Sequence, residues 1–569
     1  MEKIPREIQK IIFHHLPQKD LIGMTSISKY FNELIKNINW DLREIKIHRI
    51  EEIQYVMQTY QFAKIKIRNC HLTNPEIACP KNHEEPHLSE CELMFNHNMQ
   101  YFTHCREVNL SDCHTITNTG LRFLSNCKVL NLTRCNLTDY DLQYLGNCHR
   151  LDLSFCDAIT DVGLQYLGKC HQLDLSHCKA ITDVGLQYLK NCYKLTLSGC
   201  YYITNDGLQF LKKCRELNIC CCTKIDDTGL QYLDNCTKLN LAYCDKITNN
   251  GLRYLENCRI LNLAYCCSIT TNGLQYLKNC HKLTLSGYGL VSHAELRYLE
   301  KCRILNLSCC GFKNNNELQH LESCQKINLS HTGITNNGLQ YLKNCREINL
   351  FGCISITDNG LRHLGNCRKI NLSYCELITD VGLQYLENCQ ELKLSACKLI
   401  TGSGLQYLSN CRKIDLSFCG LITDVVLQYL GNCKKINLAN CQSITNAGLQ
   451  YLGNCKNINL ACCKITCAGL QYLNNCKKIN ISACELSTSE LEHLKIFNKK
   501  SKIIIGQFKK RVYLLTRQPN TGYVKDGGLR LGETERDATC GHGSQLLQER
   551  MDVIFDYDCS ICKKMFDSY

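Results

Sequence analysis

The stretch CHQLDLSHCKAITDVGLQYLKN, from Cys170 to Asn191, decides the fold of this chain. Its first half alternates, with Leu173 and Leu175 on one side and polar residues on the other, which is typical of a short strand with one buried face. In its second half Thr182 can cap a helix, whose apolar stripe begins at Leu186. The stretch therefore predicts one strand followed by one short helix.

Copies of this stretch follow one another over residues 105–497. A cysteine recurs every 21 or 22 residues at eighteen positions, from Cys105 to Cys476, and a second cysteine follows each after eight residues. The second cysteine is missing in two copies, which have Tyr288 and Thr332 there. One strand–helix unit cannot bury its own apolar face, so we expect stacked copies with a parallel sheet inside and helices outside.

The spacing resembles that of the cysteine-containing leucine-rich repeats, L-x-x-L-x-L-x-x-N/C with cysteine at the first leucine. The resemblance implies an α/β fold, a horseshoe-shaped leucine-rich-repeat solenoid of about 18 repeats over residues 105–497. Residues 49–104 are expected to hold degenerate capping repeats and an insertion, with a strand around Ile65 and Ile67. At the other end, Ile503 and Ile505 predict a last strand.

Composition agrees with this interpretation. The 569 residues are 44% hydrophobic and 21% charged, which fits a folded soluble protein rather than a disordered one. No stretch approaches the ~18 apolar residues of a membrane span, and residues 1–50 lack the apolar core of a secretory signal. None of the six prolines lies between Pro86 and Pro519, as expected where strands and helices keep their hydrogen bonds. The net charge of +13 is not sufficient by itself to indicate nucleic-acid binding, and we expect none.

The 46 cysteines admit several roles. Thirty-four of them occupy the two periodic positions, where the repeat predicts burial. Disulfides between neighbouring copies are not excluded by distance, because adjacent strands lie ~4.8 Å apart. An intracellular compartment would keep the thiols reduced, and cysteine is a small side chain that packs well. We therefore favour packing over disulfide, zinc or catalytic roles.

The partner-binding surface is expected on the exposed side of the strands. The residue two positions after each first cysteine varies: Arg150, Gln172, Lys194, Glu216, Lys238, Lys282, Lys326, Glu347, Lys369, Glu391, Lys413 and Lys435. Aromatic residues appear seven positions after it, at Phe155, Tyr243, Tyr265, Tyr374 and Phe418. Exposed aromatics in a groove are candidate anchors for a target protein, the alternative being that they only cover the adjacent turn.

The head of the chain carries a second motif. The pattern I-P-R-E-I-x-x-I-I-F-x-x-L-P-x-x-D-L-x(6)-S-x-x-F begins at Ile4 and resembles an F-box over residues 1–48. Phe31 stands where that family often has tryptophan. The resemblance implies an apolar contact with the Skp-type adaptor of an SCF ubiquitin ligase through Ile4, Pro5, Ile8, Ile12, Leu16 and Leu21. The alternative is a helical cap for the repeats.

Two other segments hold possible zinc ligands. Cys79, His83, His87 and Cys91 are spaced four apart, but their spacing is not that of a standard zinc site, and we favour a loop insertion. Residues 498–512 form a basic linker. Residues 513–569 contain R-Q-P, D-G-G-L-R-L-G-E-T-E-R-D and a C-x-x-C pair, Cys559 and Cys562.

This tail resembles the C-terminal part of the second-largest subunit of multisubunit RNA polymerase. In that family two C-x-x-C pairs hold one zinc ion, and only the first pair is matched here, so Cys559 and Cys562 are weak metal candidates and we expect no bound metal. We interpret the tail as a fusion remnant, with a retained docking role as the alternative. A genome that encodes its own polymerase, such as that of a large DNA virus, would explain such a fusion.

The sequence thus predicts a non-catalytic subunit that recognises substrates for an SCF-type ubiquitin ligase. No nucleophile, base and orienting group recur together, so we expect neither catalysis nor a cofactor. The expected partners are a Skp-type adaptor, the cullin ligase core and an unidentified target protein, without membrane contact, in the cytoplasm or nucleus, or in the host cytoplasm for a viral protein. The alternatives are an interaction scaffold or decoy and a polymerase-associated factor.

Overall fold

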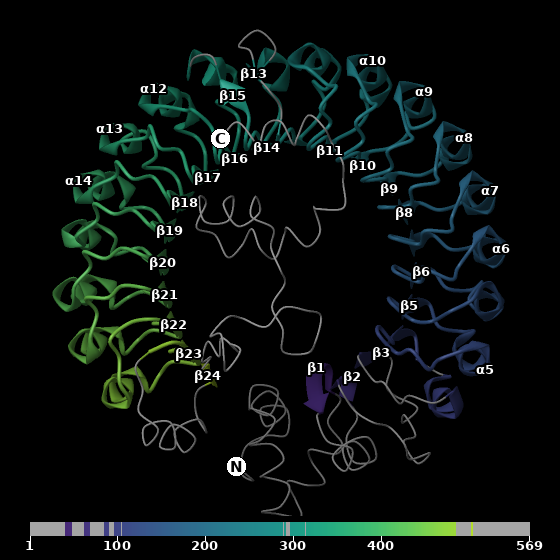
Figure 1. Ribbon diagram of the computed structural model, residues 1–569, viewed down its shortest axis with the longest axis horizontal. Helices are drawn as coiled ribbons and strands as arrows, with labels where there is room; N and C mark the ends of the chain where they lie inside the picture. Colours follow the sequence, from purple (N-terminus) through teal and green to yellow (C-terminus); the bar gives the residue numbers. More distant parts are fainter. Residues whose placement is uncertain are drawn as a thin grey trace, which may run out of the picture. The chain divides into compact units, whose positions relative to one another are not determined.

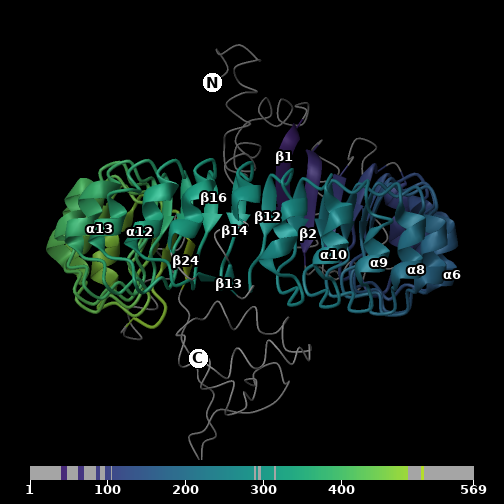
Figure 2. The ribbon, with the colours of Figure 1, turned by 90° about the horizontal axis from the view of Figure 1, so that it is seen from above.

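The computed structural model describes residues 40–47, 62–68, 85–89, 96–103, 105–287, 290–291, 296–312, 315–484 and 502–504. The chain divides into two compact units, residues 1–356 and 357–569. In each unit short parallel strands lie side by side and the helical segments cover one side of them (Figure 1). Figure 2 shows the same layers turned by 90°.

The first unit contains a parallel sheet that follows chain order. Its strands are β1 (Trp40–Ile47), β2 (Phe62–Arg68), β3 (Glu85–Ser89), β4 (Glu107–Asn109), β5 (Val129–Asn131), β6 (Arg150–Asp152), β7 (Gln172–Asp174), β8 (Lys194–Thr196), β9 (Glu216–Asn218), β10 (Lys238–Asn240), β11 (Ile260–Asn262), β12 (Lys282–Thr284), β14 (Ile304–Asn306), β16 (Lys326–Asn328) and β17 (Glu347–Asn349). A separate pair is formed by β13 (Leu290–Val291) and β15 (Gly311–Phe312).

The second unit continues the same pattern. Its strands are β18 (Lys369–Asn371), β19 (Glu391–Lys393), β20 (Lys413–Asp415), β21 (Lys435–Asn437), β22 (Asn457–Asn459), β23 (Lys478–Asn480) and β24 (Lys502–Ile504). They pair in parallel and in register, so that equivalent residues of successive repeats face one another. Each repeat therefore contributes one rung to the sheet.

The outer segments combine a four-residue α-helix with a 3₁₀ turn or consist of a 3₁₀-helix alone. The α-helices are α5 (Asn118–Leu121), α6 (Asp161–Leu164), α7 (Asp183–Leu186), α8 (Asn205–Leu208), α9 (Asp227–Leu230), α10 (Asn249–Leu252), α12 (Asn336–Leu339), α13 (Asp358–Leu361) and α14 (Asp380–Leu383). The 3₁₀-helices are η1 (Asn96–Phe102), η2 (Arg122–Leu124), η3 (Asp139–Tyr144), η4 (Gln165–Leu167), η5 (Gln187–Leu189), η6 (Gln209–Leu211), η7 (Arg253–Leu255), η8 (Thr271–Tyr276), η9 (Arg297–Leu299), η10 (Asn315–Leu321), η11 (Gln340–Leu342), η12 (Gln384–Leu386), η13 (Ser403–Tyr407), η14 (Asp424–Leu430), η15 (Asn446–Leu452) and η16 (Cys467–Leu473).

This arrangement confirms the predicted leucine-rich-repeat solenoid of strands and outer helices. In the repeat that begins at Cys170, Leu173 of β7 and Leu186 of α7 are fully buried, and Thr182 accepts a hydrogen bond from the backbone N–H of Val184 at 3.3 Å, as its capping role requires. The core of every rung is built from such leucine, isoleucine and cysteine side chains.

The strands at the two ends of the repeat array agree in part with the prediction. The predicted end strands around Ile65 and Ile503 are observed as β2 and β24. Residues Trp40–Ile47, inside the range predicted for a helical F-box, form β1 and pair in parallel with β2. The rest of that head, including Ile4 to Leu21, lies outside the described residues, as do the zinc candidates of residues 79–83, Cys91, Cys559 and Cys562 and the whole polymerase-like tail.

Candidate functional site

The exposed side of the sheet is the candidate site, and strand geometry determines which residues line it. Each three-residue strand buries its middle side chain and exposes the first and third, as in β7, where Leu173 is buried between Gln172 and Asp174. The variable first positions predicted from the sequence, Arg150 to Lys435, are all exposed or half-exposed. The fold therefore presents one variable side chain per rung on a constant apolar scaffold.

Charges on this first row pair along the sheet in several places. The Glu216 carboxylate lies 3.7 Å from the Lys194 ammonium and 3.4 Å from that of Lys238. Lys326 and Glu347 approach to 3.0 Å in the same unit. Such exposed pairs contribute little to stability, ~0–1 kcal/mol each. Their main effect is to cancel positive charge at these points of the row of first strand residues in the first unit.

In most repeats the third strand residue is Asn or Asp, and its side chain hydrogen-bonds the turn that follows the strand. The Asp152 carboxylate accepts hydrogen bonds from the backbone N–H and the hydroxyl of Ser154, at 3.0 and 2.7 Å. Asp174 makes the same contacts with Ser176, and burial is the main cause that raises the pKa of Asp174. The prevalence of Asn and Asp here thus has a structural reason, an Asx turn.

The predicted aromatic anchors do not lie on the strands. Phe155, Tyr243, Tyr265, Tyr374 and Phe418 occupy the left-handed residue of the following turn, with φ between 57° and 61°. Phe155 and Phe418 are 42% and 52% exposed, and the three tyrosines are half-exposed. The aromatics therefore line the rim where the strands end.

Some of these rim side chains stack along the solenoid. The rings of Phe155 and His177 lie 4.5 Å apart and nearly parallel, and the Arg134 guanidinium lies 5.0 Å from the Phe155 ring on its other side. Tyr243 and Tyr265 stack at 4.9 Å. Flat rings that are exposed or half-exposed, one of them with a cation over it, thus form two short platforms in the first unit, which suits them to contact a partner.

Sequence reasoning missed the glycines that make room for these rings. A Cβ at Gly199 would lie 2.7 Å from the ring of His177, and one at Gly287 would lie 2.6 Å from the ring of Tyr265. Both glycines have positive φ. The signal was present in the sequence, since Gly199 and Gly287 stand one repeat after His177 and Tyr265.

The periodic cysteines line the core rather than the site. No disulfide joins the cysteines of the described ranges, and those at the two periodic positions are buried, except Cys484, which is half-buried. Their sulfurs donate to backbone carbonyls, as Cys178 does to Leu153 at 3.2 Å. Burial raises the pKa of Cys258 and of Cys280 to about 12, so these thiols stay protonated and unreactive. The predicted burial of the periodic cysteines is confirmed.

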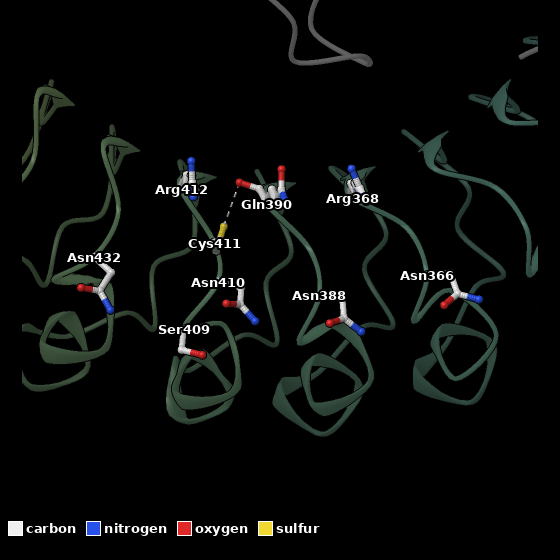
Figure 3. A pocket seen from close by; sticks show the side chains of 9 residues that line it. All are labelled: Asn366, Arg368, Asn388, Gln390, Ser409, Asn410, Cys411, Arg412 and Asn432. Carbon is white, nitrogen blue, oxygen red and sulfur yellow. Dashed lines mark hydrogen bonds between the residues drawn. The ribbon is translucent and has the colours of Figure 1, made fainter.

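A polar groove of about 690 Å³ runs along the second unit between the outer segments and the strands (Figure 3). It is lined by Asn366, Arg368, Asn388, Gln390, Ser409, Asn410, Cys411, Arg412 and Asn432. The amide groups of Asn388 and Asn410 donate to carbonyls of the preceding rungs, at 3.1 and 3.0 Å. This groove was not predicted from the sequence. The sequence did contain a sign of it, because most repeats have an asparagine directly before the first periodic cysteine, and several of these asparagines line the groove.

Among the described residues, no group of three or more His, Cys, Asp or Glu side chains is placed to hold a metal ion. Across the same ranges, no helix reaches the length and apolarity that crossing a membrane requires.

Comparison with protein families identifies the repeats. The family described as Leucine Rich repeat matches residues 103–125, 149–168, 171–190, 237–255 and 368–386. Among solved structures, an internalin of Listeria monocytogenes is 18% identical and aligns over 56% of this chain and 89% of its own, with a TM-score of 0.42. TLR13 from its complex with ssRNA13 is 16% identical over 84% of this chain and 79% of its own, with a TM-score of 0.48.

Curated relatives match over a short segment. The RNA polymerase II subunit RPB2 of Encephalitozoon cuniculi is 55% identical over 51 residues, 9% of this chain and 4% of that subunit. The RNA polymerase III subunit RPC2 of Saccharomyces cerevisiae is 51% identical over 53 residues, 9% of this chain and 5% of that subunit. The chain thus spans about one twentieth of the length of these relatives. The polymerase origin of residues 513–569 stays a prediction.

Proposed function

Taking the chain as a leucine-rich-repeat protein, we propose that it is the substrate-recognition subunit of an SCF-type ubiquitin ligase. The coarser function, an interaction scaffold, is what the described geometry supports directly. The observation that carries it is the row of variable, exposed side chains held one per rung on an otherwise uniform core. A surface that changes in chemistry while its scaffold stays constant is suited to bind a specific partner.

The ligase part of the proposal rests on the head motif. In residues 1–48 the apolar positions that resemble an F-box would dock onto a Skp-type adaptor, and other subunits would supply the ubiquitin-transfer chemistry. This chain would bring the target close to them without catalysing a step itself. Such a role calls for no cofactor, and it places the protein in the cytoplasm or nucleus, where ligase cores of this type operate.

Co-purification with a Skp-type adaptor tests the ligase proposal. The double variant Pro5→Ala, Leu16→Asp should abolish adaptor capture, since it places a charge in the proposed apolar contact. The matched control, Phe155→Ala with Phe418→Ala, changes only the rim of the solenoid and should leave adaptor capture unchanged. Equal capture by the wild type and the head variant would contradict the proposal and leave an interaction scaffold.

The short match to polymerase subunits supports a different candidate, a polymerase-associated factor. In that case residues 513–569 alone should capture polymerase subunits from a lysate. If the tail is a remnant of a gene fusion, the nucleotide sequence downstream should retain a trace of the second C-x-x-C segment in some frame. A tail that captures no subunit, with such a trace downstream, would favour the remnant.

A further inference from the structure

Positive charge gathers on the strand side of the second unit. Over four successive rungs the residue before each strand and the first strand residue are basic in all but one case. These residues, named here the basic strip, are Arg412, Lys413, Lys434, Lys435, Lys456, Lys477 and Lys478, and all are exposed. Strands β20 to β23 pair in register, so the backbone segments that carry these cations lie at the ~4.8 Å spacing of a sheet.

The repeat does not require this charge. At the first strand position in the first unit, Glu216 separates two lysines and pairs with both, and Ile260 and Ile304 leave Arg259 and Arg303 as the one basic residue of their rungs. The core is the same in both units. Like charges facing one another across a sheet are unfavourable, so the basic strip costs folding free energy that the first unit avoids.

Few carboxylates offset the basic strip among the described residues. Lys413 has an ion pair with Glu391 at 3.0 Å, and within the described ranges no ion pair joins the other members to a carboxylate. The carboxylate of Asp415 is engaged by the backbone N–H and the hydroxyl of Ser417, at 3.0 and 2.7 Å. The strip is therefore left with a large net positive charge.

Amide donors extend the strip along the third strand position. The side-chain oxygens of Asn437, Asn459 and Asn480 accept backbone N–H groups at 3.2, 3.2 and 3.1 Å. This leaves each amide N–H₂ group as the outward-facing donor. A hollow of about 330 Å³ on the same strand face is lined by these asparagines, by Lys413, Lys435 and Lys478, by the strand residues Ile414, Ile436 and Ile458, and at one end by Glu391 and Asp415. Both carboxylates at that end are already engaged, Glu391 by Lys413 and Asp415 by Ser417, so the hollow presents amide donors and lysines around an apolar floor.

We propose that the basic strip docks an acidic helical segment of the target protein. This deepens the proposed function, because it rests on the strand face receiving a target and names the chemistry of that target. Successive turns of an α-helix are 5.4 Å apart, close to the rung spacing, so glutamates at i, i+3 or i+4 along one helix face would meet one rung each.

Two features favour an acidic protein over a nucleic acid. The strip is built from lysine, with Arg412 as its single arginine, whereas bidentate recognition of phosphate favours arginine. The exposed strand positions of these four rungs also hold no aromatic side chain, and single-stranded nucleic acids are bound largely by stacking on aromatic rings.

Fluorescence anisotropy with the full-length chain tests this proposal. The probe is a labelled helical peptide of three Glu-Ala-Ala-Glu-Ala-Ala-Ala heptads, which places its glutamates on one face. A thymidine oligonucleotide of equal charge serves as the competing class. We expect the peptide to bind more tightly than the oligonucleotide and to lose affinity as salt rises.

The triple variant Lys435→Glu, Lys456→Glu, Lys478→Glu should weaken peptide binding by about tenfold or more, since each change turns attraction into repulsion. The matched control, Lys190→Glu, Lys278→Glu, Lys301→Glu, makes the same change in net charge at exposed lysines near the ends of outer segments in the first unit. It should bind the peptide within about twofold of the wild type.

Two outcomes would overturn the proposal. Tighter binding of the oligonucleotide, lost in the triple variant, would make the strip a nucleic-acid surface. Equal peptide binding by the wild type, the triple variant and the control would show that the strip is only a solvated face. Capture of a Skp-type adaptor, measured on the same three proteins, should be unchanged, so that failure of the docking site and failure of the ligase proposal are separable.

Discussion

At the scale of single residues, the turn that ends each strand shows how a side chain depends on its neighbour one repeat away. His177 lies against Phe155 on one side and over Gly199 on the other. The left-handed residue of this turn is unfavourable for most side chains, by roughly 1–2 kcal/mol. Its occupation by aromatics shows that backbone hydrogen bonds between rungs, such as Phe155 N–H to Ser176 carbonyl at 2.8 Å, outweigh that cost.

Replacing Gly199 with alanine should lower the free energy of unfolding by about 1–2 kcal/mol, because φ is +73° and the new methyl group would meet the His177 ring. Urea unfolding followed by circular dichroism measures the change. Gly333→Ala is the control, since nothing lies within 4 Å of its Cβ position. Adding His177→Ala to Gly199→Ala should recover part of the loss; no recovery would contradict the contact.

The His177 side chain should also make stability depend on pH. Burial and, secondarily, Lys179 lower the pKa of His177 from its ordinary value of 6.5. A histidine with a lowered folded pKa is protonated more readily in the unfolded chain, so its contribution to stability falls as pH drops through 6.5 toward the folded pKa.

The variant His177→Phe keeps a flat ring over Gly199 but cannot be protonated. The melting temperature of the wild type minus that of this variant should therefore be smaller at pH 5.5 than at pH 7.5, two values about one unit to either side of the ordinary histidine pKa. The same difference measured for His281→Phe, whose ring is exposed, is the control. A difference for His177→Phe that does not vary with pH would contradict this prediction.

At the scale of elements, carboxylates link each outer segment to the next. The Asp183 carboxylate accepts the backbone N–H of Thr204 at 2.8 Å and also its hydroxyl, while the Thr204 oxygen caps α8 by accepting from Asp206 N–H at 3.3 Å. Close approach explains the glycine found in most outer segments, because a Cβ at Gly207 would lie 2.3 Å from an Asp183 carboxylate oxygen. The motif T-D-x-G-L thus encodes a contact between repeats.

Asp183→Ala should lower the free energy of unfolding by about 1–3 kcal/mol, because it leaves the Thr204 N–H unpaired at a helix start. Asp183→Asn should cost much less. Asparagine already performs this role in the neighbouring repeat, where Asn205 accepts the Asp226 N–H at 3.1 Å. Urea midpoints of the two variants provide the measurement, and equal losses for both would show that charge, not hydrogen bonding, is what matters.

Local pattern was sufficient to predict the strands, but not the form of the outer segments. Leu173 and Leu175 alternate with polar residues, and this alone predicts β7. The apolar spacing of Leu427 and Leu430 suits both α and 3₁₀ geometry, and η14 is 3₁₀ throughout. The rim position of Phe155 and Phe418 was not predictable from periodicity, because the left-handed turn is held by contacts between rungs rather than by the local residues.

At the scale of the whole molecule, cysteine chemistry separates the core from the surface. Apart from the half-buried Cys484, the described cysteines that are half-buried or exposed lie outside the two periodic positions, as Cys221, Cys267 and Cys309 do. Native protein treated with an aromatic disulfide reagent should be modified at these residues and not at buried ones such as Cys258, whose pKa is raised to about 12. Peptide mass spectrometry locates the modified sites. Rapid native modification of Cys258 would contradict its burial.

The same thiols have a consequence for the lifetime of the protein. When a rung opens transiently, it uncovers two cysteines eight residues apart, within reach of thiols on a neighbouring rung ~4.8 Å away. An oxidant present at that moment would join them before the rung closes and would trap the opened state. Under oxidising conditions such disulfides would accumulate one repeat at a time, and each would persist until a reductant cleaves it.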